Sequence, residues 1–292
     1  MPARRLDGKV LAAAMRSEIA VSIAARVAVG KRPPGLAVVL VGDNPASHAY
    51  VRNKQKACAE VGVVSTLHHL PVDTSEAELL SLLASMNADP TLHGILVQLP
   101  LPPQIREEQV IEAVGPLKDV DCFHPENVGR LVTGNPRYLP CTPYGVIQLL
   151  RRNDIELAGK DVVVVGRSNI VGKPLALMLM QKPTSSNPAG CDATVTVAHT
   201  RTPDLGGVCR RADVLIAAAG KAGLITAEMV KPGAVVVDVG TNPGPGGKLV
   251  GDVAAGVENV ASALSPVPGG VGPMTITLLL ANTARAAELI DG

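Results

Sequence analysis

The chain alternates short apolar runs with longer amphipathic segments over most of its length. The segments at 35–41, 94–98, which ends in Gln98, and 161–165, which begins with Asp161, are otherwise apolar, as is typical of strands that are buried on both faces of a parallel sheet. The segments at 8–28 and 45–61 instead space their apolar residues as an amphipathic helix does. This alternation predicts an α/β protein that is built on parallel sheets.

The same pattern predicts the remaining regular elements. They are strands at 63–70, 194–198, 214–217 and 234–238 and a final helix at 272–289. Thr74 suits the N-cap of a helix that ends near Asn87, because its hydroxyl can accept a hydrogen bond from the first turn. Thr142 and Pro143 suit the N-cap and the first position of another helix.

Proline and glycine are frequent at 100–143, where little periodicity is seen outside a short segment at 106–113. We expect this region to be a loop-built surface around a site. The 292 residues are enough for two domains that each bury a core. The predicted fold is therefore two α/β domains with a cleft between them, the second a Rossmann-like doubly wound parallel sheet. The first comprises 1–142, joined by the C-terminal helix 273–292, and the second comprises 143–272.

The turn after the strand at 161–165 is suited to a bound phosphate. Gly166, Arg167 and Ser168 follow four valines, and the helix expected after them would direct backbone N–H groups toward an anion. Gly166 and Gly172 do not match the spacing G-x-G-x-x-G. The alternative that these glycines only permit a tight connection between strand and helix therefore stays open.

The end of the next strand indicates which nucleotide is bound. A NAD site has a carboxylate there for the ribose 2′-hydroxyl, whereas an NADP site has an arginine for the 2′-phosphate. Thr200 and Arg201 stand at this position, and no carboxylate does. Together with Arg167 and Ser168 they favour NADP as the cofactor, while an ordinary solvated role for Arg201 stays open.

Charge and composition narrow the range of partners. The net charge is +1 and no run of Lys or Arg is present, which argues against nucleic acid or an anionic membrane as the main partner. No stretch approaches the roughly 20 apolar residues of a membrane span, and the start lacks the apolar region of a secretory signal. We expect a small-molecule substrate and a cytoplasmic location.

Cysteine and histidine give no sign of a metal. The cysteines at 58, 122, 141, 191 and 209 are odd in number and contain no C-x-x-C, so we expect reduced thiols. His68 and His69 are adjacent, but H-E-x-x-H and comparable ligand spacings are absent. No metal is expected.

A second group of polar residues predicts a pocket in the first domain. Tyr50 and Lys54 are four apart on the helix at 45–61 and share one face, an arrangement that is usually a solvated surface. Gln98 stands at the end of a hydrophobic strand, where polar residues of α/β proteins meet ligands, and Asp121 follows in the next loop. The alternative for Asp121 is an ordinary surface carboxylate.

Six motifs, in order along nearly the whole chain, resemble the bifunctional methylenetetrahydrofolate dehydrogenase/cyclohydrolase family. They are Ser47-x-x-Tyr50-Val-x-x-Lys54, VQLPLP at 97–102, KDVD at 118–121, PCTP at 140–143, GRS at 166–168 and PVPGGVGPMT at 266–275. Each motif is modest alone, but their joint occurrence in this order is not expected by chance.

The resemblance implies a tetrahydrofolate pocket, an NADP-binding domain and a homodimer. It implies that Lys54 is the catalytic residue, beside Tyr50 and Gln98, and that Asp121 holds the pterin. Further substrate contacts are implied for Leu99, Pro100, Pro268, Gly269, Gly270 and Thr275, and cofactor contacts for Gly166, Arg167, Ser168, Thr200 and Thr241. Cys122 departs from the family pattern, which has glycine there, so a positive φ would be strained. Thr241 stands where isoleucine is more usual.

The implied activity is NADP-dependent oxidation of 5,10-methylenetetrahydrofolate, followed by hydrolysis of the methenyl product to 10-formyltetrahydrofolate. Hydride loss mainly needs alignment, whereas hydrolysis benefits from a base, which Lys54 could supply as a neutral amine. Three alternatives remain: a dehydrogenase without the hydrolase step, a non-catalytic folate- or NADP-binding paralogue, and an unrelated NADP-dependent dehydrogenase of the shikimate type. The last would not require the loop at 266–275.

Overall fold

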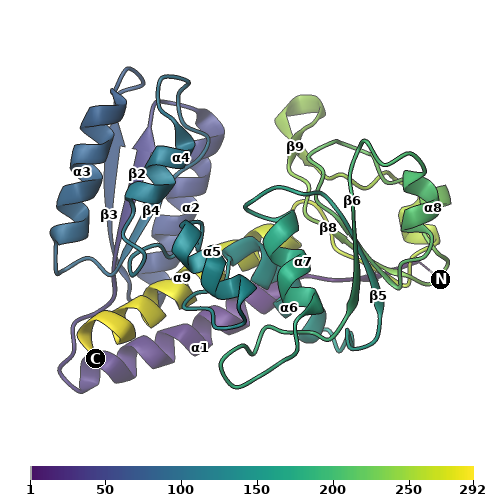
Figure 1. Ribbon diagram of the computed structural model, residues 1–292, viewed down its shortest axis with the longest axis horizontal. Coiled ribbons are helices and arrows are strands. Elements are labelled where there is room, and N and C mark those ends of the chain that lie inside the picture. The colour runs from purple at the N-terminus through teal and green to yellow at the C-terminus, as the bar shows by residue number, and fades with distance from the viewer. Residues whose placement is uncertain (1) are drawn as a thin grey trace. The chain divides into compact units, whose positions relative to one another are not determined.

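The computed structural model describes residues 2–292 and has two compact units (Figure 1). One, here called the large-sheet unit, comprises Met1–Ala13 and Leu131–Thr275. The other, the small-sheet unit, comprises Ala14–Arg130 and Ile276–Gly292. Each contains a parallel sheet with helices, which confirms the predicted α/β class.

The large-sheet unit is built on six parallel strands in the order β1-β11-β8-β7-β5-β6. Their bounds are β1 Arg4–Arg5, β5 Asp161–Val165, β6 Thr194–Ala198, β7 Val214–Ala217, β8 Val235–Asp238 and β11 Ala263–Leu264. The chain leaves β5 for β6 on one side and returns to β7 on the other. The carboxyl ends of β5 and β7 therefore form the switch point at which doubly wound sheets bind ligands.

Helices cover both faces of this sheet, and the valines of β5 alternate between the two cores. Val162 and Val164 pack in a core with residues of α6 (Cys141–Arg151) and α7 (Gly172–Met180). Val163 and Val165 pack in the opposite core with residues of α8 (Leu205–Cys209). The period of two along the strand explains why an unbroken apolar run is needed here.

Short segments complete the unit: η1 Ala227–Met229, β9 Asn242–Pro243, η2 Pro245–Gly247, β10 Leu249–Val250 and η3 Val257–Asn259.

The small-sheet unit repeats the arrangement with three parallel strands in the order β3-β2-β4. The strands are β2 Gly35–Val41, β3 Val64–Leu70 and β4 Gly94–Val97, and the helices are α2 Pro45–Val61, α3 Glu76–Ala88 and α4 Glu107–Ala113. Every residue of β2 is buried, whereas β3 at the edge is partly exposed. The switch point of this sheet lies at the carboxyl ends of β2 and β4.

Three helices begin in one unit and end in the other: α1 Gly8–Ala28, α5 Pro125–Val132 and α9 Val271–Asp291. The carboxylate of Asp291, near the end of α9, forms ion pairs with Arg26 and Arg32 within the small-sheet unit. Within residues 2–292, none of the helices has the length and apolar character that a membrane crossing requires.

The predicted start of α3 was wrong by one residue. Ser75, not Thr74, is the N-cap, and its hydroxyl accepts from the N–H of Glu78, whose carboxylate accepts from the N–H of Ser75. The spacing Ser-x-x-Glu is a capping box and identifies this start in the sequence. The hydroxyl of Thr74 donates to the carbonyl of Pro71 instead, 2.7 Å away.

The predicted start of α6 was also wrong. The helix begins at Cys141, with Pro140 as its N-cap, so Thr142 and Pro143 lie in the first turn. The Thr142 hydroxyl lies 3.0 Å from that of Thr275. This threonine therefore contacts the motif at 266–275 rather than capping a helix.

The region at 100–143 is not only a loop-built surface. It contains α5, and Val120, Leu131 and Tyr138 within it are almost completely buried. Gly129 lies inside α5 and Pro125 lies at its start. Glycine and proline both favour loops, so the sequence predicted a loop here. Proline is compatible with a first helical turn because the N–H that it lacks has no partner there.

Candidate functional site

Lys54 and Gln98 meet at the switch point of the small sheet. Lys54 projects from α2, which follows β2, and Gln98 follows β4 directly. The Lys54 Nζ donates to the Gln98 Oε1 over 3.0 Å, and the Gln98 Nε2 donates to the carbonyl of Leu99. The second bond fixes the orientation of the amide, so its oxygen faces the amine. The structure thus brings together two of the predicted catalytic residues.

The α2 helix places Lys54 through strong signals at both ends. Asn44 caps its start by accepting from the N–H groups of Ala46 and Ser47, and Gly62 ends it with a φ of 85°. These bounds are the predicted ones. Lys54 is half-buried, and within residues 2–292 it forms no ion pair with a carboxylate. The polar partner of its amine is the neutral Gln98 amide instead.

Tyr50 lies one turn before Lys54 on α2 and is also half-buried. The spacing of four residues puts both side chains on the same face of the helix, as predicted from the sequence.

Asp121 and Leu99 line one small cavity of about 30 Å³, together with Val97 and Phe123. The loop that carries Asp121 is held by Asp119, whose carboxylate accepts from the N–H groups of Phe123 and His124. Burial raises the pKa of the Asp119 carboxyl. Asp119 and Asp121 thus line the same cavity, and Asp119 also holds the backbone of the loop.

The two predicted cofactor turns leave the large sheet at the same edge. Val165 of β5 pairs with Ala198 of β6, and the N–H of Gly166 donates to the carbonyl of Ala198 over 2.9 Å. Arg167, Ser168, Thr200 and Arg201 follow these strand ends and are all exposed. Within the described residues neither arginine forms an ion pair. Two unpaired guanidinium groups near a strand edge are suited to bind a phosphate.

Ser168 has a structural role in its turn. Its hydroxyl oxygen accepts from the N–H groups of Val171 and Gly172, at 3.1 and 3.4 Å. This holds the turn that starts α7. The hydroxyl proton is not used in these two bonds, so it can still be donated to a ligand.

Packing alone requires both glycines of this turn. Gly166 has a φ of 149°, and a Cβ there would overlap the carbonyl of Ala218. A Cβ at Gly172 would overlap the carbonyl of Gly166. The contact of Gly172 with Gly166 is of the kind that the sequence alternative described, a tight connection between strand and helix, whereas Gly166 is required by its contact with the segment after β7.

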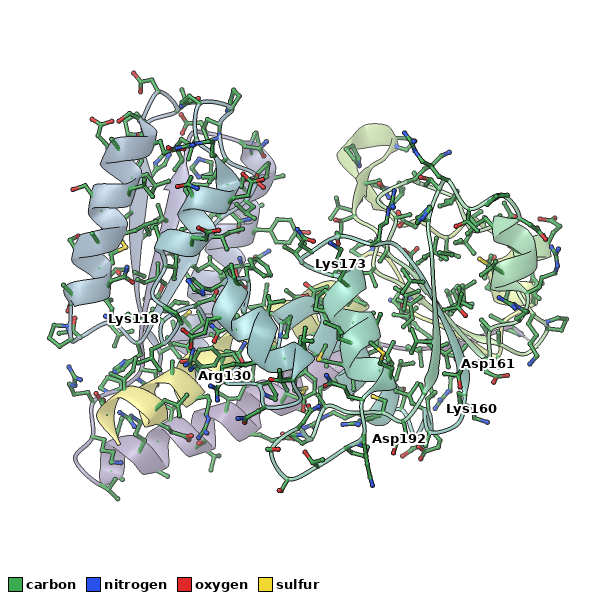
Figure 2. All side chains as sticks on the ribbon, viewed as in Figure 1. Lys118, Arg130, Lys160, Asp161, Lys173 and Asp192 are labelled. Carbon is green, nitrogen blue, oxygen red and sulfur yellow. The ribbon has the colours of Figure 1, made fainter. Side chains whose placement is uncertain are left out.

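Charged side chains distinguish the two edges of the large sheet (Figure 2). Lys160, Asp161 and Asp192 lie near the amino ends of β5 and β6, whereas Lys173 lies in the first turn of α7, beyond the carboxyl end of β5. The insertion at 182–192 thus ends at the edge opposite the cofactor turns, as expected.

Two family models match the chain. Tetrahydrofolate dehydrogenase/cyclohydrolase, catalytic domain, matches residues 6–121, and the NAD(P)-binding domain of the same name matches residues 140–290. The chain belongs to this family. The family resemblance predicted from the sequence is confirmed, and with it the enzyme class and the nicotinamide nucleotide cofactor.

Full-length relatives agree with this assignment. The chain is 57% identical over 296 residues to a bifunctional FolD protein of Rhodopirellula baltica, covering 99% of this chain and 98% of that one. It is similar in structure to a 5,10-methylenetetrahydrofolate dehydrogenase of the silkworm, with a TM-score of 0.94, 44% identity and 98% of each chain covered. A dehydrogenase-cyclohydrolase of Trypanosoma brucei, solved with NADP and an inhibitor, has a TM-score of 0.90 at 39% identity, over 99% of this chain and 98% of that one.

The departure of this chain from the family at Cys122 has a structural consequence. Cys122 has a φ of 63°, in the left-handed region that glycine adopts without strain. Its side chain is buried, and its N–H donates to the carbonyl of Asp119. The loop that carries Asp121 therefore keeps the backbone angle that favours glycine, even though the residue is cysteine.

Two buried carboxylates that hold the loops of the large sheet were not predicted from the sequence. Asp252 accepts from the N–H groups of 219–221, which follow β7, at 2.6 to 2.9 Å. Asp238, at the end of β8, accepts from the N–H groups of Gly240 and Asp252. Burial raises the pKa of Asp238. The position of Asp238 at the end of a buried strand was a signal for it in the sequence. Only the fold shows that the carboxylates of Asp238 and Asp252 both bind backbone N–H groups.

Thr241 and the motif at 266–275 lie in the large-sheet unit. Thr241 is exposed, just beyond the segment that Asp238 holds. In the motif, Pro268 is exposed while Gly269 and Gly270 are buried, and the N–H of Gly270 donates to the carbonyl of Pro266. Lys54, Gln98 and Asp121 belong to the small-sheet unit, so the predicted substrate contacts are divided between the two units.

Proposed function

We propose that this chain oxidises 5,10-methylenetetrahydrofolate with NADP and hydrolyses the methenyl product to 10-formyltetrahydrofolate, with Lys54 as the catalytic residue. The observation that carries the proposal is the bond between Lys54 and Gln98 at a switch point. The full-length similarity to bifunctional FolD proteins supports both activities.

The oxidation needs alignment rather than a base. The carbon between the two folate nitrogens can lose a hydride because an adjacent nitrogen lone pair stabilises the cation that forms. NADP, when bound, supplies the carbon that accepts the hydride. The residues of this chain hold the donor carbon and the nicotinamide in register and exclude water from them.

The hydrolysis needs a base. Water adds to the methenyl carbon, and the Lys54 amine removes the proton of that water as the new C–O bond forms. Gln98 orients the amine through its oxygen and adds no charge, so the amine is not stabilised as an ammonium by a carboxylate. The product then opens at one C–N bond to give the formyl group.

Asp121 binds the pterin end of the substrate in this proposal. A carboxylate can accept two N–H bonds from an amino-pyrimidinone ring, and Asp121 is the carboxylate that follows β4 in the next loop. Tyr50 stacks on the aminobenzoyl ring, and Pro100 extends the same surface. The segment 268–275, with Pro268, Gly269, Gly270 and Thr275, supplies further contacts to the folate in this proposal.

NADP binds to the large-sheet unit. Arg167 and Arg201 hold the 2′-phosphate, with Ser168 and Thr200 as hydroxyl donors, and Gly166 and Thr241 lie along the nucleotide. The exposed and unpaired state of both arginines supports this preference over NAD. The functional domains proposed are 1–142 with 273–292 for folate and 143–272 for NADP.

The active form is a cytoplasmic homodimer in this proposal. β3 is an edge strand, and its Val64 and Leu67 are 55% and 39% exposed, so this edge is available for pairing with a second copy of the chain. All five cysteines are buried and without disulfides, as a reducing compartment allows. Sedimentation at several concentrations tests the dimer.

The deciding experiment is an absorbance time course. With 5,10-methylenetetrahydrofolate, we expect NADPH formation that exceeds NADH formation at equal cofactor concentration. With methenyltetrahydrofolate alone, we expect enzyme-dependent loss of its absorbance. Oxidation without hydrolysis would leave a monofunctional dehydrogenase, and no turnover by folded protein would leave a ligand-binding paralogue.

A further inference from the structure

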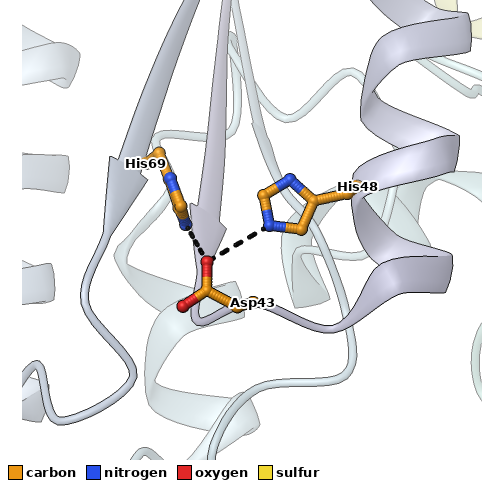
Figure 3. Close-up of side chains that lie close together, drawn as sticks. All are labelled: Asp43, His48 and His69. Atoms are coloured by element: carbon orange, nitrogen blue, oxygen red, sulfur yellow. Dashed lines mark hydrogen bonds and ion pairs between the residues drawn. The ribbon is translucent and has the colours of Figure 1, made fainter.

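Three side chains from three different elements meet at the carboxyl end of β2 and β3 (Figure 3). Asp43 follows β2, His48 lies in the first turns of α2, and His69 is near the end of β3. The Asp43 Oδ1 lies 3.4 Å from the His48 Nε2 and 3.2 Å from the His69 Nε2. The two imidazole rings are 5.0 Å apart and nearly perpendicular.

The separations match those of ligands on one small ion. Bonds of about 2.0 to 2.1 Å to a tetrahedral zinc ion put neighbouring ligand atoms about 3.3 to 3.4 Å apart. The two histidine-to-aspartate distances have this length, and the three ligand atoms all lie within 4.8 Å of one another.

We propose that Asp43, His48 and His69 bind a divalent transition-metal ion of the zinc type. Two imidazoles and one carboxylate favour zinc, nickel or copper over magnesium and calcium, which prefer oxygen ligands only. The carbonyl oxygen of Gly42 lies 3.2 Å from the His69 Nε2, so a further oxygen donor is close. Water completes the coordination.

The ion can reach this site from solvent. The Asp43 side chain is 78% exposed, and those of His48 and His69 are 30% and 41% exposed. Without metal, each Nε2 lies within hydrogen-bonding distance of an oxygen acceptor, the Asp43 carboxylate or the Gly42 carbonyl. To bind the ion, each imidazole must present its Nε2 without a proton. Metal affinity therefore falls as the pH is lowered.

The site is distinct from the proposed catalytic pair but shares its helix. His48 precedes Lys54 by six residues on α2, a rise of about 9 Å along the axis. A bound ion would tie the start of α2 and the preceding loop to β3. We expect it to raise the thermal stability of the protein without being required for hydride transfer.

Sequence spacing did not indicate this site, because its members are five and twenty-one residues apart and come from separate elements. Of the adjacent histidines His68 and His69, only His69 belongs to the proposed metal site. His68 points to the opposite face of β3, since side chains alternate along a strand. It is therefore a matched control.

The test is a zinc titration of the full-length, chelator-treated protein against a chromophoric chelator. We expect one ion per chain, and a loss of affinity of about 100-fold or more in His48→Gln and in His69→Gln. His68→Gln should bind as the wild type does. Circular dichroism and the rate of NADPH formation verify that each variant is folded.

Cobalt substitution identifies the ligands. Visible absorption of tetrahedral Co²⁺ without a sulfur charge-transfer band supports nitrogen and oxygen ligands, whereas such a band would assign the ion to a cysteine and overturn the proposal. Stoichiometric binding that persists in the His48→Gln/His69→Gln double variant would also overturn it. So would the absence of binding by the wild type, or an equal loss in His68→Gln.

Discussion

The two sheets of this protein have the same kind of switch point, but they use it differently. Between β2 and β4, the predicted site consists of side chains, and Lys54 is held directly by Gln98. Between β5 and β7, the close contact is between backbone groups, because Gly166 lies against the carbonyl of Ala218. The polar side chains predicted there are exposed, and the groups that fix the loops are the buried carboxylates Asp238 and Asp252.

This difference teaches how each site should respond to mutation. In the small-sheet unit the chemistry depends on one functional group, so removing it should change rate more than stability. In the large-sheet unit the shape of the backbone comes first, so the strongest changes should be those that alter packing. Exposed arginines there should affect only the affinity for the nucleotide.

The largest expected effect is that of Lys54→Gln. Loss of a general base should lower the hydrolysis rate by about 10²- to 10⁴-fold, while hydride transfer is reduced much less, because only hydrolysis needs proton removal. Both rates are measured with the separate substrates. Lys56→Gln is the control, since Lys56 is exposed on the same helix. Equal losses in both steps would show that Lys54 only positions the folate.

Gly166→Ala tests the backbone side of the comparison. The new methyl group would overlap the carbonyl of Ala218, and we expect a loss of about 3 kcal/mol in the free energy of unfolding, with weaker NADP binding. Gly159→Ala is the control, because Gly159 also has a positive φ, 70°, but no atom lies within 4 Å of the added carbon. It should cost about 1 kcal/mol from backbone strain alone.

The measurement for this pair is urea unfolding followed by NADP titration. If the two variants lose the same stability, the contact between Gly166 and Ala218 does not limit packing at the switch point. The distinction drawn between the two sites would then fail.

Arg201→Ala should weaken NADP binding without changing stability. A charged hydrogen bond to a phosphate is worth about 1.5 to 3 kcal/mol, which corresponds to a loss of about 10- to 150-fold in affinity. The affinity for NAD should be unchanged. Arg211→Ala, an exposed arginine of the same unit, serves as control. A parallel loss for both nucleotides would mean that Arg201 does not contact the 2′-phosphate.

Much of the fold could be predicted because buried parallel strands and capped helices leave clear local patterns. The bounds of β2 and α2 follow directly from an apolar run, an asparagine cap and a terminal glycine. The helix α5 was missed because Pro125 and Gly129 are local signals for a loop, and only tertiary packing makes that segment helical.

The candidate site shows the same division. Gln98 could be predicted because it follows an apolar strand directly. Lys54 lies in the middle of α2, and its spacing from Tyr50 and the family motif singled it out. Asp252 could not, because its role depends on backbone N–H groups about thirty residues earlier in the chain. The cluster of Asp43, His48 and His69 likewise exists only once β3 pairs with β2. Contacts between residues that are far apart in the chain produce no motif of fixed spacing in the sequence.

The smallest expected effect concerns pH, and it comes from a buried histidine of the small-sheet unit. In the small-sheet unit His93 is buried, its Nδ1 accepts from the N–H of Gly35, and its Nε2 lies 3.1 Å from a carboxylate oxygen of Asp291. Burial lowers the pKa of His93, although Asp291 opposes the shift. The folded state thus binds this proton less readily than the unfolded state, so the stabilisation is complete above the ordinary histidine pKa and is lost as the pH falls.

His93→Asn should flatten this acid loss, because the Asn oxygen can still accept from Gly35 but does not titrate. We compare urea unfolding of wild type and variant between about pH 5 and 8, reading the slope rather than the absolute stability. In the large-sheet unit burial raises the pKa of Asp238, so that group acts in the opposite direction and cannot produce the same loss. Hydrogen exchange should therefore locate the acid-sensitive opening in β2 and β4. An unchanged slope in the variant would assign the titration to another group.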